Sequence, residues 1–145
     1  MTTKPINQLI GKSDIADFPN LDLEGIDIKI DTGAYTSSFH SHSIEVVDNV
    51  LICQFLDPKH EKYHEKYFKF TDFKEKRVKS SNGIVENRFS IKTEIFIFGK
   101  SYPIDLTLTE RGSMKYPVLL GRKFLSKKFI VDTAKKNVSF KNLKK

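Results

Sequence analysis

The stretch KIDTGAYTSSFHSHS, residues 29–43, places one carboxylate, Asp31, between an apolar run and Thr32-Gly33-Ala34. Glycine allows a tight turn in which the backbone comes close to another segment. Asp31 is therefore expected at a turn that ends a strand, where its side chain can face a reaction partner. On this tripeptide alone, an ordinary Asp–Gly turn between two strands is the simpler interpretation.

Hydrolysis of an amide by paired carboxylates requires two groups that differ in protonation. Two carboxylates about 3 Å apart share a proton, because both cannot ionise. The ionised one deprotonates a water molecule while the other protonates the carbonyl oxygen. The sequence contains no second Asp-Thr-Gly or Asp-Ser-Gly. If Asp31 is catalytic, its partner must be Asp31 of a second copy, related to the first by a two-fold axis.

The rest of the chain alternates apolar and polar residues with a period of two, which indicates strands. A hairpin is expected where 91–98 and 104–108 flank Gly99-Lys100, a connection with glycine first that suits a type II′ turn. Ser80-Ser81-Asn82-Gly83 predicts a second hairpin. Further strands are predicted at 26–31, 44–47, 50–56, 67–70, 118–120 and 129–131.

Helix is scarce, and one short helix is predicted at 122–127. Many short strands with one helical turn predict an all-β barrel or sandwich. We expect one domain over residues 1–145, with a polar insertion at 57–79 and a basic tail at 141–145.

Composition and charge limit the class of protein. The formal net charge is +7, but no nucleic-acid recognition motif accompanies it, so a solvated basic surface is preferred. No apolar run is long enough to span a membrane, and the first residues lack the apolar core of a secretory signal. A cytoplasmic protein without nucleic-acid or membrane partners is expected.

The single cysteine, Cys53, lies in an apolar run and is expected to be a buried thiol.

The second half of the chain contains PVLLGRKFL, residues 117–125. The pair IDTGA and VLLGRKFL resembles the retropepsins, which are homodimeric, single-domain aspartic proteases with a closed β-barrel. The resemblance implies that Asp31 is catalytic and that Thr32 supports the catalytic pair. Gly33 and Ala34 would complete the loop. Gly121 would pack beneath it, and Arg122 would take the place of the structural arginine.

A more extensive resemblance covers nearly the whole chain. The segments IKIDTGAYTSS, RVKSSNGIVENRFSIKT, YPIDLTLTER, YPVLLGRKFL and FIVD are similar to a bacterial family of retropepsin-like proteins. Its members are often labelled ATP-dependent zinc proteases and are associated with ATP-grasp ligases that modify proteins with glutamate. The resemblance implies an aspartic endopeptidase that works as a homodimer, with a functional link to such a ligase. The alternative is a non-catalytic module of the same fold that binds a peptide or protein.

The substrate would be an extended peptide, bound by strand-like pairing. Ser80, Ser81, Asn82 and Gly83 would form the flap that covers it. Ser37 and Ser38 are further candidates for lining the cleft.

Two residues depart from the viral pattern in ways that have consequences. Tyr35 stands where an Asp would pair with the arginine, so we expect Asp132 to pair with Arg122 instead. Ala34 stands where many two-lobed aspartic proteases have Ser or Thr. Because it cannot donate a hydrogen bond to the ionised carboxylate, the shared proton should be held to higher pH. We therefore expect activity in a mildly acidic to neutral window.

A metal-dependent alternative comes from His60-Glu61-Lys62-Tyr63-His64, which matches the H-E-x-x-H pattern. That pattern binds zinc only on a helix, where both histidines share a face. Here it follows Pro58 in a polar segment, so a solvated surface segment is preferred. His40 and His42 could form half of a metal site, but two polar residues on the solvent face of a strand are preferred. No phosphate-binding loop is present, so the residues themselves predict neither a zinc nor an ATP cofactor.

Overall fold

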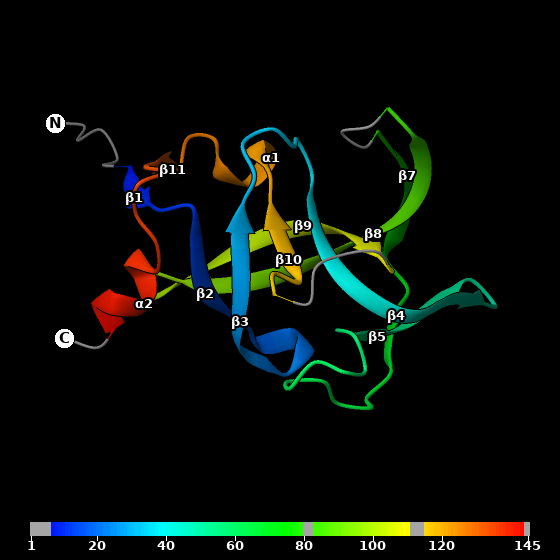
Figure 1. The fold of residues 1–145 in the computed structure, drawn as a ribbon. Helices are drawn as coiled ribbons and strands as arrows, with labels where there is room; N and C mark the ends of the chain where they lie inside the picture. Colours follow the sequence, from blue (N-terminus) through cyan, green and yellow to red (C-terminus); the bar gives the residue numbers. More distant parts are fainter. Residues whose placement is uncertain (1–6, 80–82, 111–114, 144–145) are drawn as a thin grey trace, which may run out of the picture.

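The computed structural model describes residues 7–79, 83–110 and 115–143. These residues form an almost entirely β structure (Figure 1). The strands are β1 Gln8–Ile10, β2 Ser13–Phe18, β3 Leu23–Ile30, β4 Ser37–Val47, β5 Val50–Phe55, β6 Phe68–Phe70, β7 Phe73–Lys79, β8 Val85–Ile97, β9 Lys100–Thr109, β10 Val118–Leu120 and β11 Phe129–Val131. The helices are η1 Pro19–Leu21, a short 3₁₀ turn, α1 Arg122–Leu125 and α2 Val138–Leu143.

Six strands close into a barrel, which confirms the predicted all-β, retropepsin-like architecture. They follow one another in the order β10-β3-β2-β8-β9-β4, and β10 pairs again with β4 to complete the ring. Strands β5 and β6 extend the sheet from β4, and β7 pairs with β8 outside the ring. The small β1–β11 sheet and α2 lie at one end of the molecule, and β7 lies at the other (Figure 1).

The core forms because alternate strand residues point inward. In β3, Ile26, Ile28 and Ile30 are buried while Asp27 and Lys29 are exposed. Buried aromatic rings then connect neighbouring strands: Phe39 packs edge-on against both Phe18 and Phe55, with ring centroids 5.0 Å apart in each pair. Cys53 is fully buried, as expected, and burial raises the pKa of its thiol to about 12.

Both predicted hairpins are present, but the first has a different turn. Ile97 pairs with Lys100, so the connection is Phe98-Gly99 rather than Gly99-Lys100. Both residues have positive φ, 53° and 71°, which is a type I′ turn whose twist suits paired strands. In the second hairpin β7 pairs with β8. Of its predicted turn, Ser80, Ser81 and Asn82 lie outside the described residues, and Gly83 has φ 83°.

The structure corrects the prediction for the two ends of the chain and for the insertion. Strands β1 and β2 were not expected, and α2 includes residues 141–143 of the predicted basic tail. In the predicted insertion, 73–79 is the regular strand β7, whereas 57–67 forms neither helix nor strand. Helix α1 starts where predicted but is two residues shorter. No helix in the described part of the chain is long and apolar enough to cross a membrane.

Candidate active site

The Asp31 loop begins where β3 ends, and β10 holds it in place. Strand β10 runs parallel to β3 and antiparallel to β4, so it lies between the two strands that flank the loop. The N–H of Asp31 donates to the carbonyl of Leu120 at 2.9 Å. Within the loop, the N–H of Gly33 donates to Oδ1 of Asp31 at 3.0 Å, and that of Ala34 donates to the Asp31 carbonyl at 3.2 Å. The carboxylate is therefore oriented by the loop's own backbone.

Gly121 and the first residues of α1 support the loop from below, as the resemblance implies. The N–H of Arg122 donates to the carbonyl of Ala34, and that of Lys123 to the carbonyl of Tyr35, both at 2.9 Å. A Cβ on Gly121 would lie 2.5 Å from the carbonyl oxygen of Thr36 and 2.7 Å from that of Tyr35. Only glycine allows the two segments to approach this closely.

The side chain of Arg122 does not pair with Asp132, so that prediction is wrong. Its Nη1 donates to the carbonyl of Thr32 at 2.9 Å, and its guanidinium lies over the ring of Tyr35, 5.8 Å from the centroid. Asp132 instead accepts from the N–H of Ala134 at 2.9 Å. A cation–π contact therefore replaces the ion pair, because Tyr35 stands beside the arginine in place of a carboxylate.

Ser37 and Ser38 are both buried, and Ser37 borders a pocket next to Asp105 and Lys123. The hydroxyl of Ser37 accepts from the N–H of Gly121 at 3.0 Å. This bond satisfies a buried backbone donor that would otherwise cost free energy. Sequence reasoning missed this supporting role; the available signal was a hydroxyl residue close to the loop on an otherwise buried strand.

The loop presents its outer side to solvent. Thr32 and Gly33 are exposed, Asp31 is partly exposed, and the ring of Tyr35 retains 59% of its accessible surface. Next to the predicted flap turn, Ile84 and Val85 are also exposed, at 53% and 47%.

The H-E-x-x-H segment does not form the helix that a zinc site of this type requires. Residues 57–67 carry no helix. The N–H of Lys62 donates to Nδ1 of His60 at 3.0 Å, whereas Nε2 of His64 lies 3.3 Å from the carbonyl of Leu21. The two histidines therefore make separate local contacts, and Glu61 between them is exposed.

His40 and His42 lie on β4, but the expectation that both face solvent is wrong. His40 is buried, with 6% of its surface exposed, and burial lowers the pKa of its imidazole. Its backbone connects neighbouring segments: its N–H donates to Pro117 and its carbonyl accepts from Leu56. In the described part of the chain, no three His, Cys, Asp or Glu side chains gather as a metal site.

Comparisons with known proteins identify one family and several relatives. The family described as "Retropepsin-like aspartic endopeptidase RimB" matches residues 9–142. A "Probable alpha-L-glutamate ligase" of Shewanella halifaxensis is 33% identical over 143 residues, covering 86% of this chain, and a protein of the same name from Parasynechococcus marenigrum is 31% identical over 128 residues. The matched region is 28% of the length of each of these relatives.

A solved structure shows the same fold. It is the crystal structure of a Legionella pneumophila protein of unknown function, with a TM-score of 0.71 and 24% identity, and the match covers 92% of this chain and 99% of that one. The barrel, the Asp31 loop supported by Gly121, and the family match over residues 9–142 agree. The chain belongs to the RimB-like family of retropepsin-like aspartic endopeptidases.

Proposed function

We propose that this protein is an aspartic endopeptidase that acts as a homodimer, with a water molecule activated between two copies of Asp31. The observation that carries the proposal is the position of Asp31 itself. Its backbone is held by Leu120, its carboxylate by the N–H of Gly33, and the neighbouring residues of the loop are exposed. A bond from Gly33 to the Asp31 carboxylate also occurs in structural turns, so the exposure of the loop and the family match over residues 9–142 give the catalytic role its further support.

The proposed reaction uses the two carboxylates in different protonation states. The ionised Asp31 takes a proton from water, and the oxygen of that water attacks the peptide carbonyl. The protonated Asp31 of the second copy donates its proton to the carbonyl oxygen, giving a tetrahedral intermediate. The first Asp31, which now carries the proton from water, gives it to the amide nitrogen, and the C–N bond breaks to release an amine. The second Asp31 takes back a proton from a hydroxyl of the intermediate as the carboxyl group of the product forms. Thr32 is proposed to support the pair across the two-fold axis.

The substrate is proposed to be an extended peptide that lies between the Asp31 loop and the β7–β8 hairpin. A β-rich cleft can bind such a peptide by strand-like hydrogen bonding. We also propose a functional link to an ATP-grasp glutamate ligase, because the relatives that contain a region similar to this chain are named alpha-L-glutamate ligases. Ser80, Ser81, Asn82 and Gly83 remain the proposed flap turn.

The first prediction is that Asp31→Asn abolishes cleavage of a mixed peptide library between pH 4 and 8, while the wild type cleaves it. The substitution keeps the size of the side chain but removes the group that takes the proton. Glu61→Gln is the matched control, because Glu61 is exposed and belongs to the rejected zinc pattern. It should cleave as fast as the wild type.

Each other outcome has a distinct meaning. Equal cleavage by the wild type and Asp31→Asn would contradict the proposed active site. Loss of cleavage in Glu61→Gln would return the metal-dependent mechanism to consideration. If the folded wild type cleaves nothing but binds library peptides, the non-catalytic binding module would replace the endopeptidase. An optimum near pH 3 would contradict the mildly acidic to neutral window expected from Ala34.

A further inference from the structure

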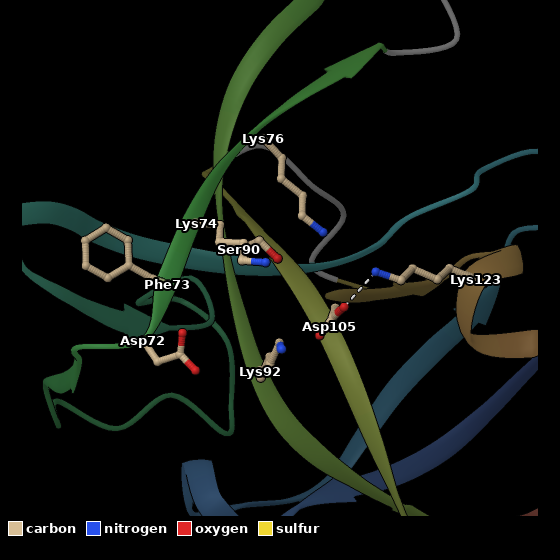
Figure 2. A pocket seen from close by; sticks show the side chains of 8 residues that line it. All are labelled: Asp72, Phe73, Lys74, Lys76, Ser90, Lys92, Asp105 and Lys123. Atoms are coloured by element: carbon tan, nitrogen blue, oxygen red, sulfur yellow. Dashed lines mark hydrogen bonds and ion pairs between the residues drawn. The ribbon is translucent and has the colours of Figure 1, made fainter.

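A pocket of about 200 Å³ lies between strand β7, the neighbouring strands β8 and β9, and helix α1 (Figure 2). Most of its lining is charged, and the charged residues are Asp72, Lys74, Lys76, Lys92, Asp105 and Lys123. The lining therefore carries four lysines and two aspartates. We refer to it as the lysine pocket.

The lysine pocket is assembled from segments far apart in the sequence. Lys74 and Lys76 are two residues apart, so they share a face of β7. Lys92 pairs directly with Asp105 across the β8–β9 ladder. Lys123 reaches in from α1, and Figure 2 shows Lys76 and Lys123 extending toward Asp105 from β7 and α1. The β7–β8 and β8–β9 pairings and the position of α1, rather than a run of charge in the sequence, bring these groups together.

The single negative charge of Asp105 does not balance the positive charges of Lys76, Lys92 and Lys123, which all act on it. Nζ of Lys123 lies 2.7 Å from Oδ2 of Asp105, and this hydrogen bond lowers the pKa of Asp105 and raises that of Lys123. Asp105 is thus engaged by Lys123. Lys76 is less favourably placed: burial and the charge of Lys123 both lower its pKa. Like charges this close repel one another, and a bound anion would relieve the repulsion.

We propose that the lysine pocket is a binding site for an oxyanion, a carboxylate or phosphate group, held by Lys76, Lys92 and Lys123. Ammonium groups bind such anions by charge-assisted hydrogen bonds. The site is distinct from the Asp31 carboxylate but adjoins its loop, because the backbone N–H of Lys123 donates to Tyr35. The proposal does not depend on peptidase activity. The anion has two sources, a free ion or an acidic side chain on a polypeptide.

The test measures binding to the full chain carrying Asp31→Asn, so that no peptide can be cleaved by the proposed mechanism. Inorganic phosphate and a blocked tri-aspartate peptide are titrated separately at low ionic strength by isothermal calorimetry. At least one probe should bind saturably. Lys76→Gln and Lys92→Gln should each raise its Kd at least about fivefold, whereas Asp105→Asn should lower the Kd. Circular dichroism checks that each variant is folded.

Lys29→Gln is the matched control, because it removes the same charge from an exposed position on β3 that does not line the pocket. Its Kd should stay within about twofold of the parent. No saturable binding of either probe, an equal loss in Lys29→Gln, or a higher Kd in Asp105→Asn would overturn the proposal. Binding of phosphate assigns the site to free anions, whereas binding of the peptide alone assigns it to carboxylates on a polypeptide.

Discussion

At the scale of single residues, the buried carboxylate of Asp14 holds the C-terminal helix to the barrel. Its side chain is fully buried on β2. Oδ2 accepts from the N–H of Ser139 at 2.9 Å, and Oδ1 accepts from those of Phe140 at 3.2 Å and Ile15 at 2.8 Å. Burial raises the pKa of Asp14, although these hydrogen bonds oppose the shift. One residue therefore joins segments at opposite ends of the chain.

The prediction for Asp14 concerns stability and its dependence on pH. Asp14→Ala leaves buried N–H groups without an acceptor, which should lower the free energy of unfolding by about 1–3 kcal/mol. Asp14→Asn should cost less, because its carbonyl oxygen still accepts. The pKa of Asp14 is higher in the folded state than in the unfolded state. Above about pH 4, the folded state therefore keeps a proton on Asp14 that the unfolded state has released. As pH rises from 4, the free energy of unfolding of the wild type should therefore fall relative to that of Asp14→Asn, which does not titrate at this position.

Urea unfolding of both variants and the wild type, followed at several pH values from 4 to 7, checks this. If the wild type instead gains stability relative to Asp14→Asn across that range, the direction of the Asp14 pKa shift is contradicted.

At the scale of elements, the junction of β10 and α1 supports the Asp31 loop through backbone contacts. The N–H of Gly121 donates to Ser37, and the next two N–H groups donate to the carbonyls of Ala34 and Tyr35. The short helix begins at Arg122 because Gly121 has an extended backbone, φ −96° and ψ 179°. Any residue can adopt this backbone conformation. Glycine is required here because the carbonyls of Tyr35 and Thr36 come too close for a side chain.

We predict that Gly121→Ala destabilises the protein and moves the loop. The added methyl group would overlap the carbonyls of Tyr35 and Thr36, so the segments must separate. The expected loss in the free energy of unfolding is about 1–3 kcal/mol, as for other overpacked sites. Thermal unfolding measures it, and Ser126→Ala at the exposed end of α1 serves as the control. A melting temperature equal to that of the control would mean that the loop can accept the added methyl group, and would contradict the predicted overlap with Tyr35 and Thr36.

At the scale of the whole molecule, the proposed active site is complete only when two chains meet. Each chain supplies one Asp31 on an exposed loop. The ring of Tyr35 and the residues beside the flap turn are exposed in the single chain, as is Ile130 of β11, at 55%. These apolar groups would lose contact with water if a second copy covered them. The activity of a dimer assembled in this way must depend on protein concentration.

The prediction for the dimer is that inactive chains poison active ones. When wild type is mixed and equilibrated with a large excess of Asp31→Asn, most active chains should join inactive partners, and the specific activity of the wild type should fall several-fold. Dilution should lower it as well, and analytical ultracentrifugation should give a matching dissociation constant. Glu61→Gln in the same excess is the control: because this variant is itself expected to be active, the total activity should rise in proportion to the chains added. Activity proportional to the amount of wild type in the mixture would contradict a shared site.

Much of the fold could be predicted because it is local in the sequence. The alternation of apolar and polar residues predicted the central strands. The turn residues predicted the positions of the hairpins to within one residue, but not that Phe98 would have a positive φ. The motifs around Asp31 and Gly121 predicted that two distant segments meet, which the hydrogen bonds between them confirm. The short strands β1 and β2 were missed because their apolar residues are few and lie among polar ones.

The sequence by itself thus determined the strand-rich class, the loop that presents Asp31, and the glycine beneath it, because each depends on neighbouring residues or on a short motif. Only the tertiary structure decided which side chains from distant strands meet. Arg122 lies over Tyr35 instead of pairing with Asp132, Asp14 binds helix α2, and four lysines line one pocket with Asp105. These contacts join segments that are far apart in the sequence, so they depend on how the barrel, strand β7 and the helices pack together.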